Sequence, residues 1–157
     1  MKSYLVLIIT TFGFFISCEK NFGPTEFSSN LSVIFTKSEY RADESVQFLI
    51  ENNAEETIRF LANTCQGPIG FKIEKIINDS WSHQRNYHLE YNTDSNGVAI
   101  ICQMEPLTLK SGGKYAANEF LNLDYGEYRL ILNYYFGEYY KPDQEIRSFY
   151  TKSFIVN

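Results

Sequence analysis

The feature of this 157-residue chain that most restricts its fold is a period-two alternation of apolar and polar side chains, which begins at Leu31. Successive side chains of a β-strand point to opposite faces of a sheet, so this alternation predicts half-buried strands. The 12 Tyr and 13 Phe strengthen the prediction, because both residue types favour strands. The predicted inward-facing residues are Leu31, Val33 and Phe35; Val46, Phe48 and Ile50; Ile58 and Phe60; Phe71 and Ile73; Tyr87, Leu89 and Tyr91; Val98, Ile100 and Cys102; and Tyr128, Leu130, Leu132, Tyr134 and Phe136.

Turn-forming residues separate the predicted strands at short intervals, as at Asn78-Asp79-Ser80 and Ser111-Gly112-Gly113. About seven to nine strands with this spacing predict an all-β fold, an antiparallel β-sandwich, over residues 31–157. Residues 114–123 suit a strand or a short helix equally well. Residues 147–156 are predicted to form one last strand, and its inward face is ambiguous because both registers hold apolar residues.

The first 17 residues differ from the rest of the chain. Lys2 precedes an apolar run from Tyr4 to Ile16, which is shorter than the ~20 residues that a membrane-spanning helix needs. Its length fits the apolar core of a secretory signal. We therefore expect residues 1–17 to be a signal peptide and residues 18–30, which contain Gly23 and Pro24, to be a flexible tether.

The apolar run ends in Phe15-Ile16-Ser17-Cys18, which resembles the lipobox of bacterial lipoproteins, with Phe15 where that family usually has Leu. The resemblance implies cleavage before Cys18, acylation of its sulfur and amine, and attachment of the domain to a membrane at the cell envelope. Two or more acyl chains would anchor the protein stably. The alternatives are a cleaved signal with an incidental cysteine and an uncleaved anchor helix.

Asp124, Gly126 and Tyr128 form the pattern Asp-x-Gly-x-Tyr directly before the longest predicted strand. The pattern resembles the tyrosine corner of immunoglobulin-like sandwiches, in which a Tyr hydroxyl near the start of the penultimate strand bonds back to nearby backbone. Glycine allows the chain to turn there without a Cβ clash. The resemblance implies an immunoglobulin-like β-sandwich, and the alternative is an ordinary turn followed by a core tyrosine.

The order of elements over residues 31–157 also resembles that of small lipoproteins with one immunoglobulin-like domain. The shared elements include Tyr-x-x-x-Glu-Ser-Val-x-Phe from Tyr40 to Phe48 and Gly-x-Tyr-Arg-Leu from Gly126 to Leu130. The bacterial intracellular proteinase inhibitors are similar in outline. Those inhibitors are cytoplasmic, whereas a lipobox implies export. Inhibition of proteases that reach the envelope is therefore the alternative function.

Two cysteines, Cys65 and Cys102, remain once Cys18 is assigned to the lipid. In an exported, oxidising setting we expect a disulfide between them, with a stabilisation of about 4 kcal/mol in the chain-entropy model. Two buried thiols and a metal site are the alternatives. The sequence disfavours a metal, because it has no Cys-x-x-Cys and its only two histidines, His83 and His88, would lie on opposite faces of one strand.

Charge and motifs narrow the function further. With 14 Lys and Arg against 19 Asp and Glu, the net charge is −5, so we expect no nucleic-acid partner, since phosphate contacts need clustered basic residues. No Gly-x-Ser-x-Gly, phosphate-binding glycine loop or His-Glu-x-x-His occurs, and Asp94, Asn96 and Gly97 match a calcium loop only in part. We therefore expect no catalytic residues, no cofactor and no metal.

Aromatic residues gather at the loop before the last strand, where Tyr139 and Tyr140 lie in the loop and Tyr135 is out of register with the core side chains. Loops at the ends of a sandwich are common binding sites, and Tyr offers rigid contact area. We expect a non-catalytic, lipid-anchored binding or accessory domain whose ligand is a protein or a glycan held by these rings. The alternatives are that the rings only close the sandwich end, and that the chain is a hydrolase with an unrecognised site.

Overall fold

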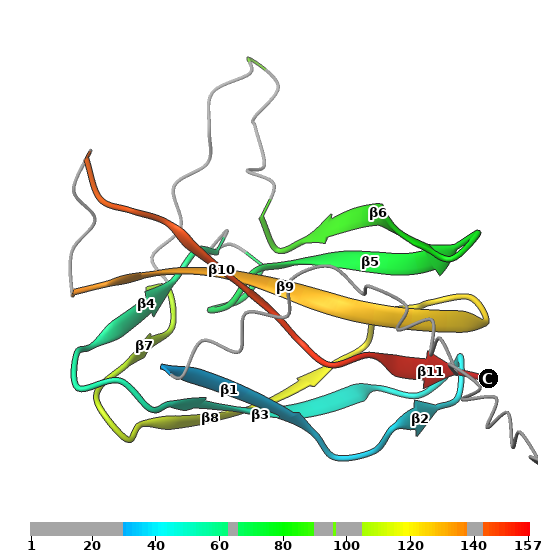
Figure 1. The fold of residues 1–157 in the computed structure, drawn as a ribbon, viewed down its shortest axis with the longest axis horizontal. Helices are drawn as coiled ribbons and strands as arrows, with labels where there is room; N and C mark the ends of the chain where they lie inside the picture. Colours follow the sequence, from blue (N-terminus) through cyan, green and yellow to red (C-terminus); the bar gives the residue numbers. More distant parts are fainter. Residues whose placement is uncertain (1–29, 63–65, 90–95, 97–104, 138–142) are drawn as a thin grey trace, which may run out of the picture.

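The computed structural model describes residues 30–62, 66–89, 96, 105–137 and 143–157. These residues form strands and no helix, and so no helix that could cross a membrane. The strands make two facing sheets (Figure 1), which confirms the predicted all-β sandwich. The eleven strands are β1 (Leu31–Phe35), β2 (Glu39–Tyr40), β3 (Val46–Asn52), β4 (Ile58–Phe60), β5 (Phe71–Ile77), β6 (Ser80–Tyr87), β7 (Thr108–Leu109), β8 (Lys114–Glu119), β9 (Gly126–Phe136), β10 (Arg147–Tyr150) and β11 (Phe154–Val156).

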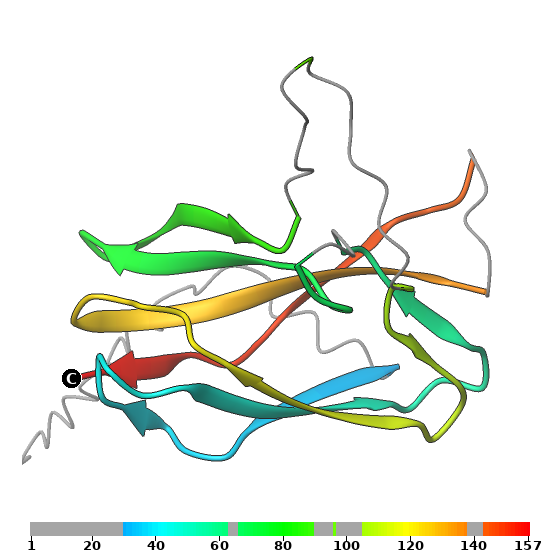
Figure 2. The same ribbon diagram turned by 180° about the vertical axis from the view of Figure 1, so that it is seen from behind.

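The smaller sheet has the order β1-β3-β8 and is antiparallel throughout. The larger sheet is built around β9, which pairs with β4 and β5 along one edge and with β10 and β11 along the other. The chain passes from the larger sheet to the smaller one between β7 and β8 (Figure 2). Strands β1, β3 and β8 of the smaller sheet lie opposite β5, β9 and β11 of the larger one.

The core lies between the two sheets and is formed by the predicted period-two faces. Phe48 of β3 and Phe71 of β5 meet edge to face across it, with 6.0 Å between their ring centroids. On β9, Tyr128, Leu130 and Tyr134 are almost fully buried. The alternation therefore predicted correctly which side chains of these strands lie in the core.

The hairpin of β5 and β6 turns through two residues, Asn78 and Asp79, with φ angles of 50° and 61°. Two positive φ angles are typical of a type I′ turn, which Asn and Asp adopt more easily than other side chains. The predicted turn is confirmed, but β6 begins at Ser80 and ends at Tyr87, where a strand was predicted to begin. Leu89 lies outside the strand, and Tyr91 and residues 98–102 lie outside the described residues.

The predicted last strand is broken in two around Thr151. The Thr151 N–H donates to the Leu130 carbonyl at 3.0 Å, and its Oγ1 accepts from the Leu130 N–H at 2.9 Å. The Thr151 hydroxyl thus takes the position of a backbone acceptor. Pairing with β9 resumes at Phe154 with the register shifted by one residue. This break, together with the two-residue strands β2 and β7, raises the strand count above the predicted seven to nine. Residues 114–119 form β8, which removes the helical alternative for that part of the chain.

The chain reverses into β9 at the predicted tyrosine corner. The Tyr128 hydroxyl donates to the Asp124 carbonyl at 2.8 Å, which is the backbone contact that such corners make. Gly126 has a φ of 154°, where residues with a Cβ are strained. The corner therefore needs both the glycine and the tyrosine.

Asn52, at the end of β3, is fully buried and bonds to backbone on three sides. Its Nδ2 donates to the carbonyls of Glu56 at 2.8 Å and Leu109 at 2.9 Å, and its Oδ1 accepts from the Ala54 N–H at 2.9 Å. The side chain ties the end of β3, in the smaller sheet, to β7, in the larger one.

Candidate functional site

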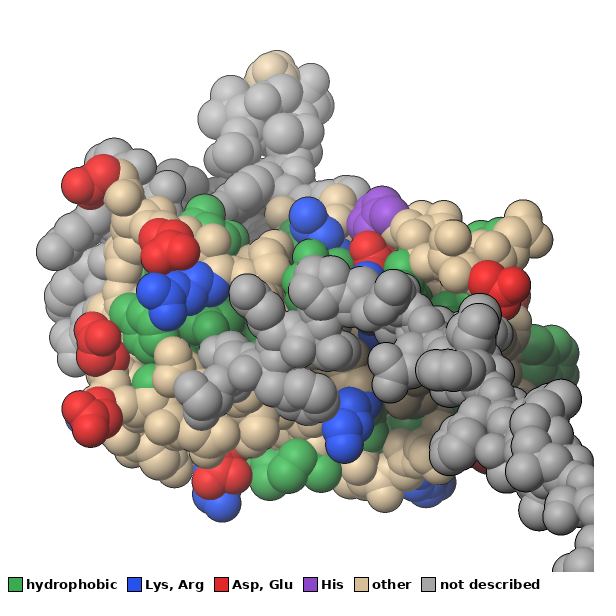
Figure 3. Space-filling view, in the orientation of Figure 1, with side chains coloured by type: hydrophobic (Ala, Val, Ile, Leu, Met, Phe, Trp, Pro, Cys, Tyr) green, Lys and Arg blue, Asp and Glu red, His purple; other side chains and the backbone are tan. Residues whose placement is uncertain are grey.

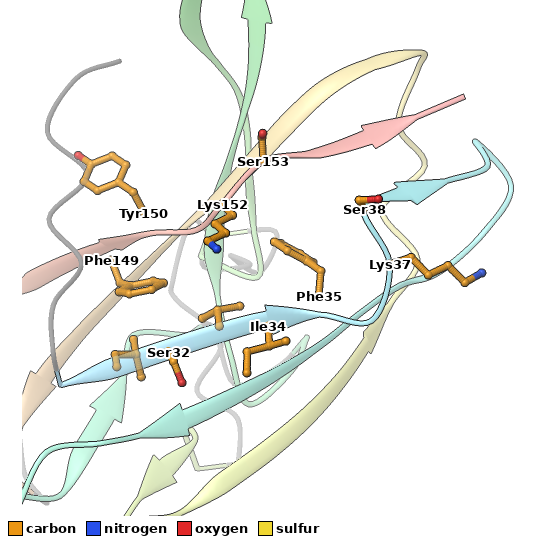
Figure 4. A pocket seen from close by; sticks show the side chains of 11 residues that line it. Ser32, Ile34, Phe35, Lys37, Ser38, Phe149, Tyr150, Lys152 and Ser153 are labelled. Atoms are coloured by element: carbon orange, nitrogen blue, oxygen red, sulfur yellow. The ribbon is translucent and has the colours of Figure 1, made fainter. Parts of the chain in front are cut away.

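A groove of about 400 Å³ lies between β1 and the segment that joins β10 to β11 (Figure 4). Its volume lies within the range of about 300–1,000 Å³ that is common for ligand sites. Apolar side chains form most of its lining, and serines and two lysines lie along its rim. We call this hollow the β1–β10 groove, and its lining residues are Leu31, Ser32, Val33, Ile34, Phe35, Lys37, Ser38, Phe149, Tyr150, Lys152 and Ser153.

One wall of the β1–β10 groove is the open edge of β1. Within the described residues β1 pairs with β3 alone. The Thr36 N–H donates to Gln47 at 3.0 Å, and the Asn53 N–H donates to Asn30 at 2.8 Å, which fixes the phase of the ladder. In an antiparallel ladder every second residue bonds to the partner strand. The backbone groups of Val33 and its neighbours at 31 and 35 therefore point away from β3, toward the groove.

The opposite wall is the outer edge of β10. The hydrogen bond from Thr151 to Leu130 sets the phase of pairing with β9, so the N–H and C=O groups of Ser148 and Tyr150 point away from β9. The Phe149 ring lines this wall, and Figure 4 shows Lys152 between Phe149 and Phe35. Two strand edges with outward-pointing backbone groups thus border one apolar hollow.

Positive charge lies along the rim although the chain has a net charge of −5. Lys37 and Lys152 both line the β1–β10 groove, and Lys37 forms an ion pair with Glu44. The Lys37 hydrogen bond holds the pKa of the Glu44 carboxyl below its usual value. Elsewhere on the face shown in Figure 3, acidic and basic side chains are interspersed.

The groove lining offers hydroxyl and ammonium groups, backbone edges and apolar contact area. No carboxylate and no imidazole occurs among the described lining residues, whose polar side chains are the hydroxyls of Tyr150 and three serines and the ammonium groups of Lys37 and Lys152. The described residues also contain no cluster of three or more His, Cys, Asp or Glu side chains that could hold a metal ion.

No protein-family model matches this chain, and no curated protein is significantly similar to it. The candidate site is therefore defined by its own geometry.

A second cluster lies on the outer face of the larger sheet, where Arg129 of β9 is held by Glu74 of β5. Its Nε and Nη2 both lie 2.7 Å from Glu74 Oε2. The guanidinium also lies over the rings of Trp81 and Tyr150, at 4.3 Å and 4.8 Å from their centroids. The cluster joins four adjacent strands. Because its groups contact one another, we interpret it as a structural cluster that stabilises the larger sheet.

A third cluster closes the side of the sandwich opposite the β1–β10 groove. The Tyr87 hydroxyl of β6 donates to Glu119 Oε2 of β8 at 3.0 Å, which links the two sheets. Burial, followed by the charge of Glu119, raises the pKa of Tyr87 to about 12. The His88 ring stacks on Tyr87, with centroids 4.0 Å apart, and lies where a Cβ on Gly67 would come within 2.5 Å. His83 is exposed on β6, away from this stack along the chain.

Of the aromatic residues expected to bind a ligand, only Tyr135 is described, and its side chain is 4% exposed. It points to the outer face of β9, as its register predicts, but burial removes it from solvent, so the prediction of a surface contact is wrong for this ring. Tyr139 and Tyr140 lie outside the described residues. Cys18, Cys65 and Cys102 also lie outside them, so the lipid and the disulfide stay predictions.

The β1–β10 groove could not be predicted from the sequence, because strand alternation assigns Leu31 and Val33 to the core and does not indicate which strand edges remain open. One signal was available. The sequence of β1, Leu-Ser-Val-Ile-Phe, contains no charge and no proline, although edge strands usually carry one of these against unwanted pairing.

Proposed function

We propose that this protein is a non-catalytic binding domain of the cell envelope, anchored through a lipid on Cys18, with its ligand site in the β1–β10 groove. The observation that carries the proposal is the groove itself, an apolar hollow bordered by two open strand edges. Its described lining combines hydrogen-bonding and apolar groups and holds neither a carboxylate nor an imidazole. Such a lining suits recognition of a ligand rather than its conversion.

The expected anchor and the groove lie close together in the chain. Residues 19–30 separate Cys18 from Leu31, which is both the first residue of β1 and part of the groove lining. A flexible tether of this length, as the sequence predicts, spans about 20 Å on average. A ligand in the groove would therefore lie near the membrane surface, which suits a partner that is itself at the envelope.

The anchor is tested by the intact mass of the protein extracted from membranes, measured with and without reductant. We expect the mass of residues 18–157 plus acyl chains, and two alkylated thiols after reduction only. The variant Cys18→Ala should lose the acyl mass and leave the membrane fraction. An unlipidated protein of full length would refute the anchor, and thiols that are alkylated without reductant would refute the disulfide.

The binding site is tested in intact cells with a photo-crosslinking amino acid placed at Ile34, on the rim of the groove. Phe120 is a matched control, because it is 56% exposed, Ile34 is 55% exposed, and Phe120 lies outside the groove lining. We expect a discrete adduct from position 34 that is absent from position 120. Digestion of the adduct by a protease or a glycosidase identifies its class. No adduct at 34, or the same products at both positions, would refute the site.

A further inference from the structure

We propose that the β1–β10 groove binds an extended polypeptide segment of a partner protein, which adds as a strand to the open edge of β1. This inference rests on the proposed function and narrows its ligand from a protein or glycan to a strand. The occupant has alternating apolar side chains and at least one acidic side chain. Three observations support this occupant, namely the direction of the β1 backbone groups, the sequence of β1 and the charges at the rim of the groove.

The backbone groups of β1 favour a strand over other ligands. N–H and C=O groups at residues 31, 33 and 35 point into the groove at intervals of two residues. An extended peptide presents its own N–H and C=O groups at the same interval, so the two sets can form a continuous ladder. A glycan has no such repeat of alternating donors and acceptors, and would leave part of this edge unmatched.

The sequence of β1 supports the same conclusion. Natural edge strands are usually protected from pairing by a charged residue, a proline or a bulge. β1 has none of these, since it pairs with β3 in one unbroken register from Leu31 to Phe35. Ile34, on its outer face, is 55% exposed. An apolar, unprotected edge of this kind is a pairing surface.

The groove determines which side chains the added strand carries. Val33, Phe35 and Phe149 present apolar surface on the inner side of the groove, so every second side chain of the strand is expected to be apolar. Lys152 lies between the two phenylalanines, and Lys37 lies at the far end of β1. Because Lys37 is paired with Glu44, an acidic side chain in the strand would complement the positive charge of Lys152, in a protein whose net charge is negative.

The test begins with peptides selected from a random dodecapeptide display library on the purified, soluble Cys18→Ala protein. The selected peptides should share alternating apolar residues and carry Asp or Glu. Each is then synthesised with single backbone N-methyl groups along its length, and its affinity is measured by fluorescence anisotropy. N-methylation should weaken binding at least tenfold at every second residue and change it little at the intervening ones. Equal effects at neighbouring positions, or no selected peptide, would overturn the proposal.

Variants of the protein provide an independent measurement. Val33→Pro removes an N–H that faces the groove and leaves the hydrogen bonds of β1 to β3 in place, so the affinity should fall about tenfold. Lys152→Glu should lower the affinity for an acidic peptide about tenfold at low salt. The control Lys72→Glu, at an exposed site outside the groove, should leave this affinity unchanged. Ile34→Glu adds to the edge a charge of the same sign as the acidic peptide without removing a hydrogen bond, so it provides a second variant that should weaken binding if Val33→Pro fails to fold. Unchanged affinity in the folded groove variants would overturn the proposal.

The two proposals fail in different ways. If position 34 forms an adduct in cells but the N-methyl scan has no alternation, strand addition is overturned and the binding function stands. If the scan alternates but position 34 forms no adduct in cells, strand addition is supported for the purified protein and the envelope function is overturned.

Discussion

Removal of the Asn52 side chain should destabilise the protein more than any other single polar substitution discussed above. The side chain is fully buried, and each of its three hydrogen bonds goes to a backbone group. The change Asn52→Ala leaves the Ala54 N–H and the carbonyls of Glu56 and Leu109 without this partner. At about 1 kcal/mol for each net hydrogen bond, plus the cost of the unpaired buried groups, the free energy of unfolding should fall by about 3–5 kcal/mol.

The assay is equilibrium unfolding in urea at neutral pH, with Asn53→Ala as the control. Asn53 is the next residue and is exposed, so its truncation should change the free energy of unfolding by less than about 0.5 kcal/mol. A loss below about 1 kcal/mol for Asn52→Ala would refute the reasoning, because it would mean that water replaces the three contacts at little cost.

The variant Asn52→Asp separates hydrogen bonding from the loss of volume. The carboxylate keeps an acceptor for Ala54 but places a charge against the two carbonyls, so burial and these oxygens should raise its folded-state pKa. A raised pKa means that the folded state is favoured when the group is protonated and loses stability as pH rises above about 4. Asn52→Asp should therefore be less destabilised, relative to the parent, at pH 4 than at pH 7. An equal loss at both values would refute the electrostatic part.

Three other substitutions test contacts between strands. Tyr128→Phe removes one hydrogen bond to a backbone carbonyl at the corner and should lower the free energy of unfolding by about 1 kcal/mol in urea titrations, whereas no change would show that the corner is held by ring packing alone. Burial and Glu119 raise the pKa of Tyr87 from 10 to about 12. The melting temperature of the parent should therefore fall as pH rises from about 10 to 12, and this part of the fall should be absent in Tyr87→Phe. Arg129→Lys loses a two-nitrogen contact and the stacking on two rings, and calorimetry should show a loss of about 1–2 kcal/mol; a neutral result would mean that the cluster contributes no stability.

The sequence predicted those parts of the fold where one face of a strand is buried. In β3 and β9 the buried residues follow the period-two pattern, and the Asp-x-Gly-x-Tyr pattern precedes the hydrogen bond from Tyr128 to Asp124. The β6 sequence, Ser-Trp-Ser-His-Gln-Arg-Asn-Tyr, is polar on both faces, because β6 lies at the edge of the larger sheet. Alternation gave no signal there, and only the Asn78-Asp79 turn indicated a hairpin.

Features that depend on contacts between distant segments could not be predicted. The break at Thr151 arises because a side-chain hydroxyl competes successfully for the Leu130 N–H, and the sequence shows only another threonine in a strand. Tyr135 faces outward from β9, yet it is buried, so register alone did not decide its exposure. The β1–β10 groove depends on which edges the two sheets leave open, and this is a property of the topology.

The position of β9 has a consequence for the order of folding. Four other strands pair with β9, which spans residues 126–136, whereas the strands β4 and β5 that precede it lack these partners until the chain has reached that point. The parallel pair of β2 and β11 joins residues 39–40 to residues 155–156, so it closes almost the whole described chain. A fold dominated by contacts between such distant residues forms slowly, in milliseconds to seconds for domains of this class. The larger sheet therefore assembles only after residues 126–156 have been synthesised, and backbone amides of β9 should be among the last to exchange with solvent.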